Sequence, residues 1–395
     1  MIPTFSTSHL PGLDFGCGVF QKTATVVQRY GQRVLLVTGG RSFQESKNWS
    51  KLQELAAQSS LSMKHFQVMG EPSPQLVDSA VQQFKFDEID VVLGIGGGSA
   101  LDAAKAIAGL LRLNHSVMDF LEGVGPEIPY PGPAVPFIAL PTTAGTGSEM
   151  TKNAVLSVAG KNGFKKSFRD EKLMAQQVLL DPDLLSTCPA GVIAANGMDA
   201  LTQLLESYVS IKANPFTDAL ALSGMLSVRQ GLIPWFAAGH AHIEAQTHMA
   251  YASMLSGITL AQVGLGSVHG LASPLGAFFP IPHGVVCGTL VAEATRVNIQ
   301  AMLQREPNND ALSKYAHAAE VLCGKRFSSK EAAWEALMQC LQDWKVQLGL
   351  PGLGQYGVSG TDVDDLVKNA RGSSMKTNPI ELTDEEIGAL ILSCL

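Results

Sequence analysis

The first half of the chain alternates short apolar runs with segments of helical spacing, and this alternation constrains the fold more than any other feature. The apolar runs lie at 33–38 (RVLLVT), 91–95 (VVLGI) and 137–140 (FIAL). Helical spacing follows the first two runs, over 46–58 and 100–112. Short apolar strands separated by helices are typical of a parallel sheet covered on both faces. We therefore predict an α/β N-terminal domain with a parallel sheet.

From about residue 185 the chain changes to long segments that share helical spacing. These segments are 191–210, 215–236, 242–261, 309–322, 329–348, 362–371 and 383–393. No strand pattern of comparable strength follows, so we predict an all-α C-terminal domain. The turn residues Asp181–Asp183 place the domain boundary nearby, which gives domains 1–184 and 185–395.

The composition argues against several classes of partner. Hydrophobic residues make up 46% of the 395 residues and charged residues 16%, enough for a large core. The net charge is -7 and no long basic cluster occurs, so we expect neither nucleic acid nor a membrane as partner. The six cysteines are scattered, and no signal-peptide pattern or long apolar run is present. We therefore expect a cytoplasmic protein with reduced thiols.

A glycine-rich turn, Gly94–Ser99 (GIGGGS), follows the second apolar run and opens a predicted helix. Glycines allow close approach of the backbone to a pyrophosphate, and the N–H groups and dipole of the helix start favour an anion. The usual dinucleotide pattern has a third glycine where this chain has Ser99, so a plain strand-to-helix turn stays an alternative. The turn favours a Rossmann-like cofactor site.

A carboxylate and two imidazoles are candidates for one metal site. Asp199 and Gln203 are four residues apart on a predicted helix and therefore share a face. His269 and His283 flank prolines and glycines over 274–282, which we expect to form a loop that brings the imidazoles together. One Asp and two His suit Fe²⁺ or Zn²⁺ with open positions. For His269, a hydrogen-bonded core histidine is the alternative.

Four motifs resemble the iron-containing (group III) alcohol dehydrogenase family. They are GIGGGSALDAAKAIA, PTTAGTGSEMT, GMDALTQLLE and VHGLASPLGAFFPIPHG, which begin at residues 94, 141, 197 and 268. The resemblance covers nearly the whole chain. It implies a dehydroquinate synthase-like fold, a homodimer or higher homo-oligomer, and hydride transfer between a nicotinamide and a small alcohol or aldehyde. In that reaction the metal acts as a Lewis acid.

The resemblance also implies which residues bind the cofactor. We expect this role for Gly97, Gly98, Ser99, Asp102, Thr142, Thr143, Thr146 and Lys166. Among these, the glycines hold the pyrophosphate and the threonines contact the nicotinamide half.

The residues after the first strand bear on the choice of nicotinamide. Family members that prefer NAD typically end this strand with Thr-Asp, and the carboxylate binds the ribose 2′-hydroxyl. Here the sequence is Thr38 followed by Gly39, Gly40, Arg41 and Ser42. The missing carboxylate and the added N–H, guanidinium and hydroxyl donors suit a 2′-phosphate. We predict NADP(H) over NAD(H), with a simple turn and a solvated Arg41 as the alternative.

Two positions depart from the family pattern, which has histidine at both. Gln203 is a weaker candidate ligand, and it leaves two outcomes open. The metal is held by Asp199, His269 and His283, as in the related glycerol dehydrogenases that bind zinc through Asp-His-His, or the metal is lost. We favour three ligands, which suffice for a catalytic zinc. Ser273 cannot titrate near neutral pH, so we expect altered proton transfer.

Two further residues near these motifs are ambiguous. Cys287 follows His283 by four residues and could approach a metal, although a buried free cysteine is the commoner explanation. Glu206 is expected to be a structural carboxylate. The alternatives to a dehydrogenase are a lyase of the dehydroquinate synthase type and a cofactor-binding relic, or metal-free reductase, that lost its metal through Gln203.

Overall fold

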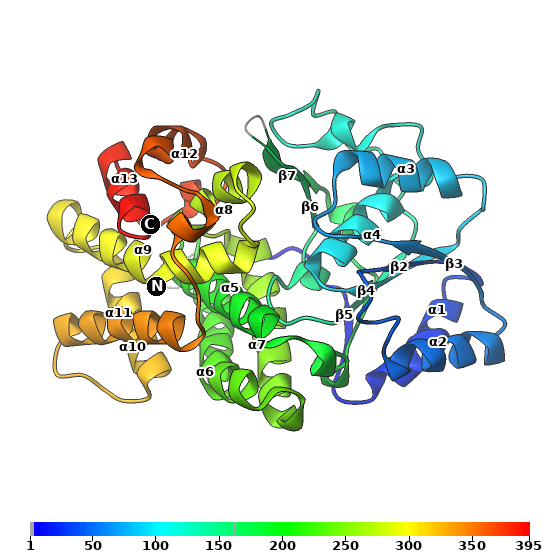
Figure 1. The fold of residues 1–395 in the computed structure, drawn as a ribbon, viewed down its shortest axis with the longest axis horizontal. Helices are drawn as coiled ribbons and strands as arrows, with labels where there is room; N and C mark the ends of the chain where they lie inside the picture. Colours follow the sequence, from blue (N-terminus) through cyan, green and yellow to red (C-terminus); the bar gives the residue numbers. More distant parts are fainter. Residues whose placement is uncertain (1–3, 161–162) are drawn as a thin grey trace. The chain divides into compact units, whose positions relative to one another are not determined.

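The computed structural model describes residues 4–160 and 163–395. They form two compact units, shown in Figure 1. The α/β unit comprises 9–158 and 165–188. The helical unit comprises 189–395 with the described parts of 4–8 and 159–164. Among the described residues, no helix combines the length and hydropathy that a bilayer span requires.

The α/β unit is built on a six-stranded sheet in the order β1-β8-β5-β4-β2-β3, and every pairing in it is parallel. Its strands are β1 (Gly12–Phe15), β2 (Arg33–Thr38), β3 (Ser62–Gln67), β4 (Val91–Gly96), β5 (Phe137–Pro141) and β8 (Gln177–Leu180). The strands β6 (Asn153–Val158) and β7 (Phe164–Arg169) form a separate two-stranded sheet. The predicted parallel sheet is confirmed.

Helices cover both faces of the large sheet. They are α1 (Thr23–Gln28), α2 (Lys47–Gln58), α3 (Pro74–Phe84) and α4 (Gly98–Leu110). The pair α1 and α2 lies on one face and the pair α3 and α4 on the other (Figure 1). This double cover explains why β4 and β5 are buried along their whole length and read as unbroken apolar runs.

The strand order creates a point where the chain reverses direction across the sheet. From β2 the chain passes outward to β3, then returns to β4 on the other side of β2. At such a reversal the connections leave the carboxyl ends of neighbouring strands toward opposite faces, which opens a crevice for ligands. The glycines after β2 and β4 lie at this reversal.

The second unit is helical in its described part, as predicted. Its helices are α5 (Ala190–Val209), α6 (Pro215–Ala238), α7 (Ile243–Val263), α8 (Ser267–Phe278), α9 (His283–Arg305), α10 (Asp310–Cys323), α11 (Lys330–Gln347), α12 (Val363–Asn369) and α13 (Asp384–Leu392). Nearly every residue of α5 from Ile193 onward is buried, because α6, α7 and α9 pack around it. The polar side chains that α5 carries, Asp199, Gln203 and Glu206 among them, are therefore buried inside this unit.

The loop predicted between the two histidines is wrong over most of its length. Ser267–Phe278 forms α8, which contains Pro274, and only 279–282 is irregular. A proline inside a helix costs about 3 kcal/mol. Burial of Val268, Leu271 and Leu275 contributes about 1.5–3 kcal/mol each, which outweighs that cost. Tertiary packing therefore overrides the local proline signal.

Candidate metal centre and cofactor loop

Four side chains converge within the helical unit. Asp199 comes from α5, His269 from α8, and His283 and Cys287 from α9. Each offers one ligand atom, and these atoms all lie within 4.8 Å of one another. Asp199 Oδ1 is 3.2 Å from His269 Nε2 and 3.7 Å from His283 Nε2. Cys287 Sγ lies 3.6 Å and 3.8 Å from the same two nitrogens.

These spacings match those of a metal site. Ligand atoms placed tetrahedrally at about 2.0–2.3 Å from one ion lie about 3.3–3.8 Å from each other. The separations of 3.2, 3.6, 3.7 and 3.8 Å in the cluster fall close to that range. Imidazole, carboxylate and thiol groups are also the donors that Fe²⁺ and Zn²⁺ accept. The residues present therefore fit a divalent ion.

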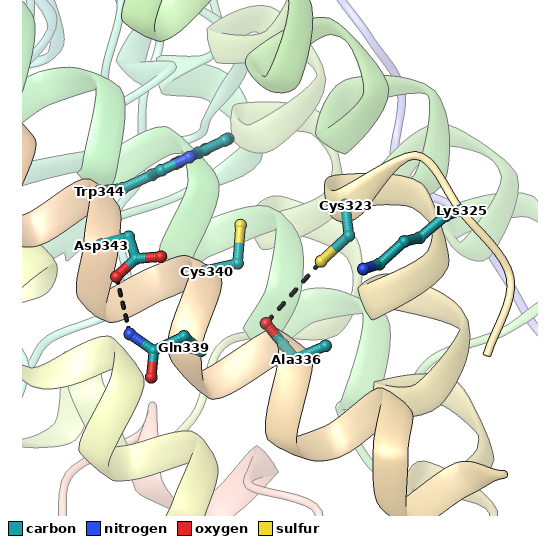
Figure 2. Close-up of a pocket in the computed structure, with 7 residues that line it drawn as sticks. All are labelled: Cys323, Lys325, Ala336, Gln339, Cys340, Asp343 and Trp344. Atoms are coloured by element: carbon teal, nitrogen blue, oxygen red, sulfur yellow. Dashed lines mark hydrogen bonds between the residues drawn. The ribbon is translucent and has the colours of Figure 1, made fainter. Parts of the chain in front are cut away.

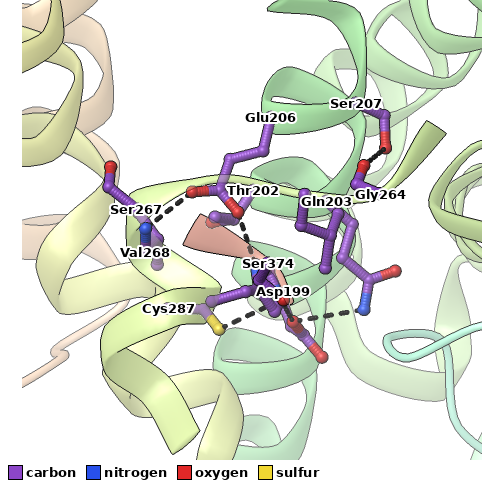
Figure 3. Close-up of polar contacts among 12 residues, drawn as sticks. Asp199, Thr202, Gln203, Glu206, Ser207, Gly264, Ser267, Val268, Cys287 and Ser374 are labelled. Carbon is purple, nitrogen blue, oxygen red and sulfur yellow. Dashed lines mark hydrogen bonds and ion pairs between the residues drawn. The ribbon is translucent and has the colours of Figure 1, made fainter. Parts of the chain in front are cut away.

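Glu206 fixes the orientation of one imidazole. Its Oε2 lies 2.7 Å from His269 Nδ1, while its Oε1 accepts the Val268 N–H at 2.6 Å. Figure 3 shows this carboxylate reaching the Val268 backbone. When Nδ1–H donates to Glu206, the Nε2 lone pair is left facing Asp199. Glu206 therefore orients the His269 imidazole.

Gln203 turns its nitrogen, not its oxygen, toward the cluster. Its Nε2 is 3.5 Å from Asp199 Oδ1, and Figure 3 shows the amide nitrogen directed at that carboxylate. Within the described structure, Asp199 Oδ2 and Gln203 Oε1 are buried oxygens that find no hydrogen-bond partner. An unpaired buried oxygen costs about 1–3 kcal/mol. A cation at Asp199 would compensate the carboxylate oxygen.

Burial and the neighbouring charged groups shift the pKa values of the side chains in the cluster. Burial raises the pKa of Asp199, but His283 and His269 outweigh it, and its net pKa lies below the usual range. Burial lowers the pKa of His269, but Cys287 and the carboxylates of Asp199 and Glu206 bring it well above the usual value. Burial also raises the pKa of the Cys287 thiol to about 12. Without an ion, the cluster therefore holds protons that a bound cation displaces.

In the α/β unit, the glycine turn and the PTTAGTGSEMT motif lie against each other. A Cβ built on Gly97 would lie 3.1 Å from Thr143 Oγ1. A Cβ built on Gly98 would lie 2.7 Å from Thr146 Oγ1, closer than real Cβ contacts. Only glycine at these positions lets the threonine hydroxyls sit beside the N-terminus of α4.

The ends of β2, β4 and β5 meet at this glycine turn. Thr142 N donates to Gly96 O at 2.9 Å. A Cβ built on Gly96 would lie 3.1 Å from Gly39 N, so the two glycine turns are in contact. Arg41 and Ser42 follow and are exposed to solvent. The structure thus brings the predicted cofactor residues of β2, β4 and β5 together.

The other predicted cofactor residues have different surroundings. Ser99 lies in the first turn of α4. Gly40 O accepts a hydrogen bond from Gln67 Nε2 at 2.9 Å, which ties this turn to β3. Lys166 lies on β7 beside Gly123, where its Nζ is 3.6 Å from a Cβ built on that glycine. Lys166 therefore belongs to the small sheet and not to the glycine turn.

A buried charge network lies beneath the turn. Asp102 Oδ1 accepts from Ser148 Oγ, and its Oδ2 accepts from Val155 N at 3.2 Å. Lys105 is fully buried and donates to Ser148 O at 2.8 Å and Thr151 Oγ1 at 3.0 Å. Asp102 and Lys105 therefore hold α4 against the end of the PTTAGTGSEMT motif. Lys105 lies in the GIGGGSALDAAKAIA motif, and this position is the one sequence signal for its role.

Comparison with known proteins decides the family. Residues 12–182 match the model for iron-containing alcohol dehydrogenase, and 193–395 match that for the C-terminal part of the Fe-containing alcohol dehydrogenase family. This chain belongs to the iron-containing alcohol dehydrogenase family. It is therefore a metal-dependent, nicotinamide-linked alcohol or aldehyde oxidoreductase. The predicted family and reaction are confirmed.

Several relatives of this dehydrogenase match along most or all of their length. An NAD-dependent methanol dehydrogenase of Bacillus methanolicus is 31% identical over 390 residues, 98% of both chains. Alcohol dehydrogenase 4 of Schizosaccharomyces pombe is 32% identical, over 99% of this chain and 89% of that one. The crystal structure of a 1,3-propanediol oxidoreductase superposes with a TM-score of 0.90 at 27% identity, covering 100% of both chains. A sulfoacetaldehyde reductase of Bifidobacterium kashiwanohense, in complex with NAD+, gives 0.84 at 26% identity over 99% of both.

A pocket of this dehydrogenase lies apart from the metal cluster, on α10 and α11 (Figure 2). Its lining residues are Cys323, Lys325, Ala336, Gln339, Cys340, Asp343 and Trp344. Gln339 Nε2 donates to Asp343 Oδ1 at 2.7 Å, so these two polar groups satisfy each other. The pocket shares no residue with the cluster, and we assign it no part in the reaction.

Proposed function

We propose that Asp199, His269 and His283 hold the catalytic metal of this dehydrogenase. The observation that carries the proposal is the spacing of their ligand atoms, with Asp199 Oδ1 at 3.2 Å and 3.7 Å from the two imidazole Nε2 atoms. The bound divalent ion supplies a Lewis acid for the C–O group of a small alcohol or aldehyde. Asp199 contributes the negative charge, and Glu206 keeps the His269 Nε2 directed at the site.

The test combines metal content with turnover. Protein purified without chelator or His-tag, analysed by elemental mass spectrometry, is expected to carry near-stoichiometric iron or zinc. In Asp199→Ala the metal is expected to fall to background, and kcat/KM to fall by about 10³ or more, since a Lewis acid contributes several kcal/mol. NADPH binding, which we assign to the other unit, serves as the folding control. Metal retained at wild-type level in Asp199→Ala would exclude this ligand set.

The substrate panel follows from the relatives. Methanol, 1,3-propanediol and sulfoacetaldehyde are named in those proteins, so short alcohols and their aldehydes are the first compounds to assay. Metal analysis also distinguishes iron from zinc, both of which suit the donor set.

For the cofactor, the proposal is that NADP(H) binds in preference to NAD(H). The support is that Gly39 to Ser42 place no carboxylate after β2 and leave Arg41 exposed. The bound nicotinamide cofactor is expected to contact the turn formed by Gly97, Gly98 and Ser99 and the threonines Thr142, Thr143 and Thr146. One relative is an NAD-dependent methanol dehydrogenase, so the cofactor preference of this chain has to be measured directly. We expect a higher kcat/KM with NADPH than with NADH, and about a tenfold loss of this ratio in Arg41→Ala.

The proton route is assigned to Ser273. It lies one turn after His269 on α8, on the same helix face, and is partly buried. Its hydroxyl can pass a proton only within a hydrogen-bonded chain. Ser273→Ala is expected to lower turnover and alter the pH–rate profile, while the metal content stays at wild-type level. An unchanged profile with unchanged turnover would remove Ser273 from the mechanism.

The assembly we propose is a homodimer or higher homo-oligomer in the cytoplasm. The edge strand β1 exposes Leu13 (40%) and Phe15 (36%), and an apolar sheet edge is a template for pairing with another chain. All six cysteines are free thiols, which is typical of a reducing compartment. Light scattering on the purified protein tests the oligomer.

A further inference from the structure

One member of the cluster has no counterpart in the predicted ligand set. Cys287 lies one turn after His283 on α9, and Pro282 fixes the start of that helix. Residues four apart share a helix face, so the thiol and the imidazole point the same way. Cys287 is fully buried, and its Sγ is 3.6 Å from His269 Nε2 and 3.8 Å from His283 Nε2.

A second observation concerns the carboxylate of the same cluster. Asp199 is 1% exposed, and within the described structure its Oδ2 has no hydrogen-bond partner. The ligand atoms that Asp199 and Cys287 offer lie within 4.8 Å of each other, so the carboxylate and the thiol face the same space. A buried carboxylate oxygen left open beside a thiol and two imidazoles points to a cation bound among them.

The only other cluster of this kind among the described residues lacks these features. Cys17, Asp181 and Asp183 also bring three possible ligand atoms together. The Asp181 oxygens, however, already accept the N–H groups of Phe20 at 2.9 Å and Asp183 at 3.0 Å. Cys17 and Asp183 are exposed as well. Backbone capping explains that group without an ion.

Gln203 faces the same cluster. It stands where the family resemblance places a histidine, and its amide nitrogen faces Asp199 at 3.5 Å. In that orientation it is a donor to the carboxylate and cannot ligate an ion through nitrogen. The ligand set is therefore short of one donor at position 203, while Cys287 brings one from α9.

We propose that Cys287 is the fourth protein ligand of the metal and that Gln203 only holds Asp199 in place. This inference rests on the metal site of the proposed function. As the metal–sulfur bond forms, the thiol releases its proton to solvent, so charge and atoms balance. Asp199 and the thiolate then cancel both charges of a divalent ion. The soft sulfur favours Zn²⁺, Fe²⁺ and Co²⁺ over Mg²⁺ and Mn²⁺.

Cobalt reconstitution tests the assignment directly. The full chain is stripped of metal, titrated with Co²⁺ and followed by absorption. A thiolate ligand gives an intense sulfur-to-cobalt band in the near ultraviolet, which carboxylate and imidazole ligands do not give. We expect this band at one Co²⁺ per chain, its loss in Cys287→Ser, and a Co²⁺ affinity at least tenfold weaker in that variant.

The matched control is Cys394→Ser. Cys394 is a buried thiol of the same unit that contacts α9 through Thr289 O at 3.7 Å, yet it lies outside the cluster. We expect its variant to keep the band. NADPH binding and the melting temperature report whether both variants fold. The Co²⁺ spectrum of the wild-type chain tests for a thiolate ligand even if a variant fails to fold.

The outcomes separate this inference from the proposed function. Stoichiometric Co²⁺ without the band, or a band that survives in Cys287→Ser, would overturn the role of Cys287 and leave the three-ligand site intact. No Co²⁺ bound by the wild-type chain would overturn both, and the dehydrogenase would then need another metal site.

Discussion

The candidate cofactor loop, formed by the glycine turn and the PTTAGTGSEMT motif, and the candidate metal cluster around Asp199 use buried charge in opposite ways. In the loop, the charged pair Asp102 and Lys105 lies beneath the glycines and is hydrogen-bonded to the protein. In the cluster, the charged and polar side chains face one another, and Asp199 keeps one oxygen unpaired within the described structure. Under the proposed function, the loop uses its charges to position the backbone, whereas the cluster uses them to bind the metal.

The two regions also differ in how the chain assembles them. The loop consists of turns directly after β2, β4 and β5, so local sequence and strand order are enough to build it. The cluster depends on the packing of α5, α8 and α9. A change in one region should therefore leave the other intact, and the following substitutions test this separation.

Of these substitutions, Glu206→Gln in the metal region is expected to have the largest effect. The variant replaces the carboxylate that accepts from His269 Nδ1 with a neutral amide, which weakens the alignment and basicity of that ligand. Loss of such a partner typically costs about 10–100-fold in metal affinity. The measurement is a chelator competition for Zn²⁺. NADPH affinity should not change.

Glu293→Gln is the matched control, because Glu293 pairs with Arg296 on α9 outside the cluster. Equal metal affinity in wild type and Glu206→Gln would mean that this carboxylate only supports the Val268 backbone.

Gly98→Ala should have a smaller effect, confined to the cofactor region. The added Cβ would lie 2.7 Å from Thr146 Oγ1, so the turn or the threonine must move. Overpacking of this kind costs about 1–3 kcal/mol, and we expect NADPH affinity to fall about tenfold, measured by fluorescence titration. Metal content should stay at the wild-type value.

Gly191→Ala at the start of α5 is its control, since a Cβ there meets nothing within 4 Å. If metal binding fell together with NADPH affinity in Gly98→Ala, the two regions would not be independent.

The same contrast explains how far the sequence could be interpreted. Strands β2, β4 and β5 follow from apolar runs, and the glycine turn follows from spacing, because these features are local. The helix α8 was missed because Pro274 signals a break that only buried packing overrides. The short edge strand β1 and the polar strand β3 carry little apolar pattern.

The site shows the same limit. The motifs that resemble the family supplied Asp199, His269 and His283, and the structure brings all three together. Cys287 was ambiguous, since four-residue spacing matters only if α9 begins at His283. The contact of Glu206 with His269 could not be predicted, because it depends on α8 packing beside α5, and no local sequence pattern shows that packing.

The smallest predicted effect is on the pH dependence of stability, and it concerns Glu149, a buried acid in the PTTAGTGSEMT motif. Burial raises its pKa from 4.5 to about 7. The unfolded chain therefore releases this proton first as pH rises. Stability that is fully present below pH 4.5 is lost progressively up to about pH 7. The pKa difference corresponds to at most about 3–4 kcal/mol.

Glu149→Gln keeps the shape of this side chain but has no proton to lose. Relative to wild type, its melting temperature should therefore rise by a few degrees between pH 5 and pH 8, while metal content stays constant. Differential scanning fluorimetry at both pH values measures this difference. A difference that is the same at pH 5 and pH 8 would show that Glu149 is ionised in the folded protein. The loop would then hold a further negative charge that its buried neighbours, Lys105 first among them, must balance.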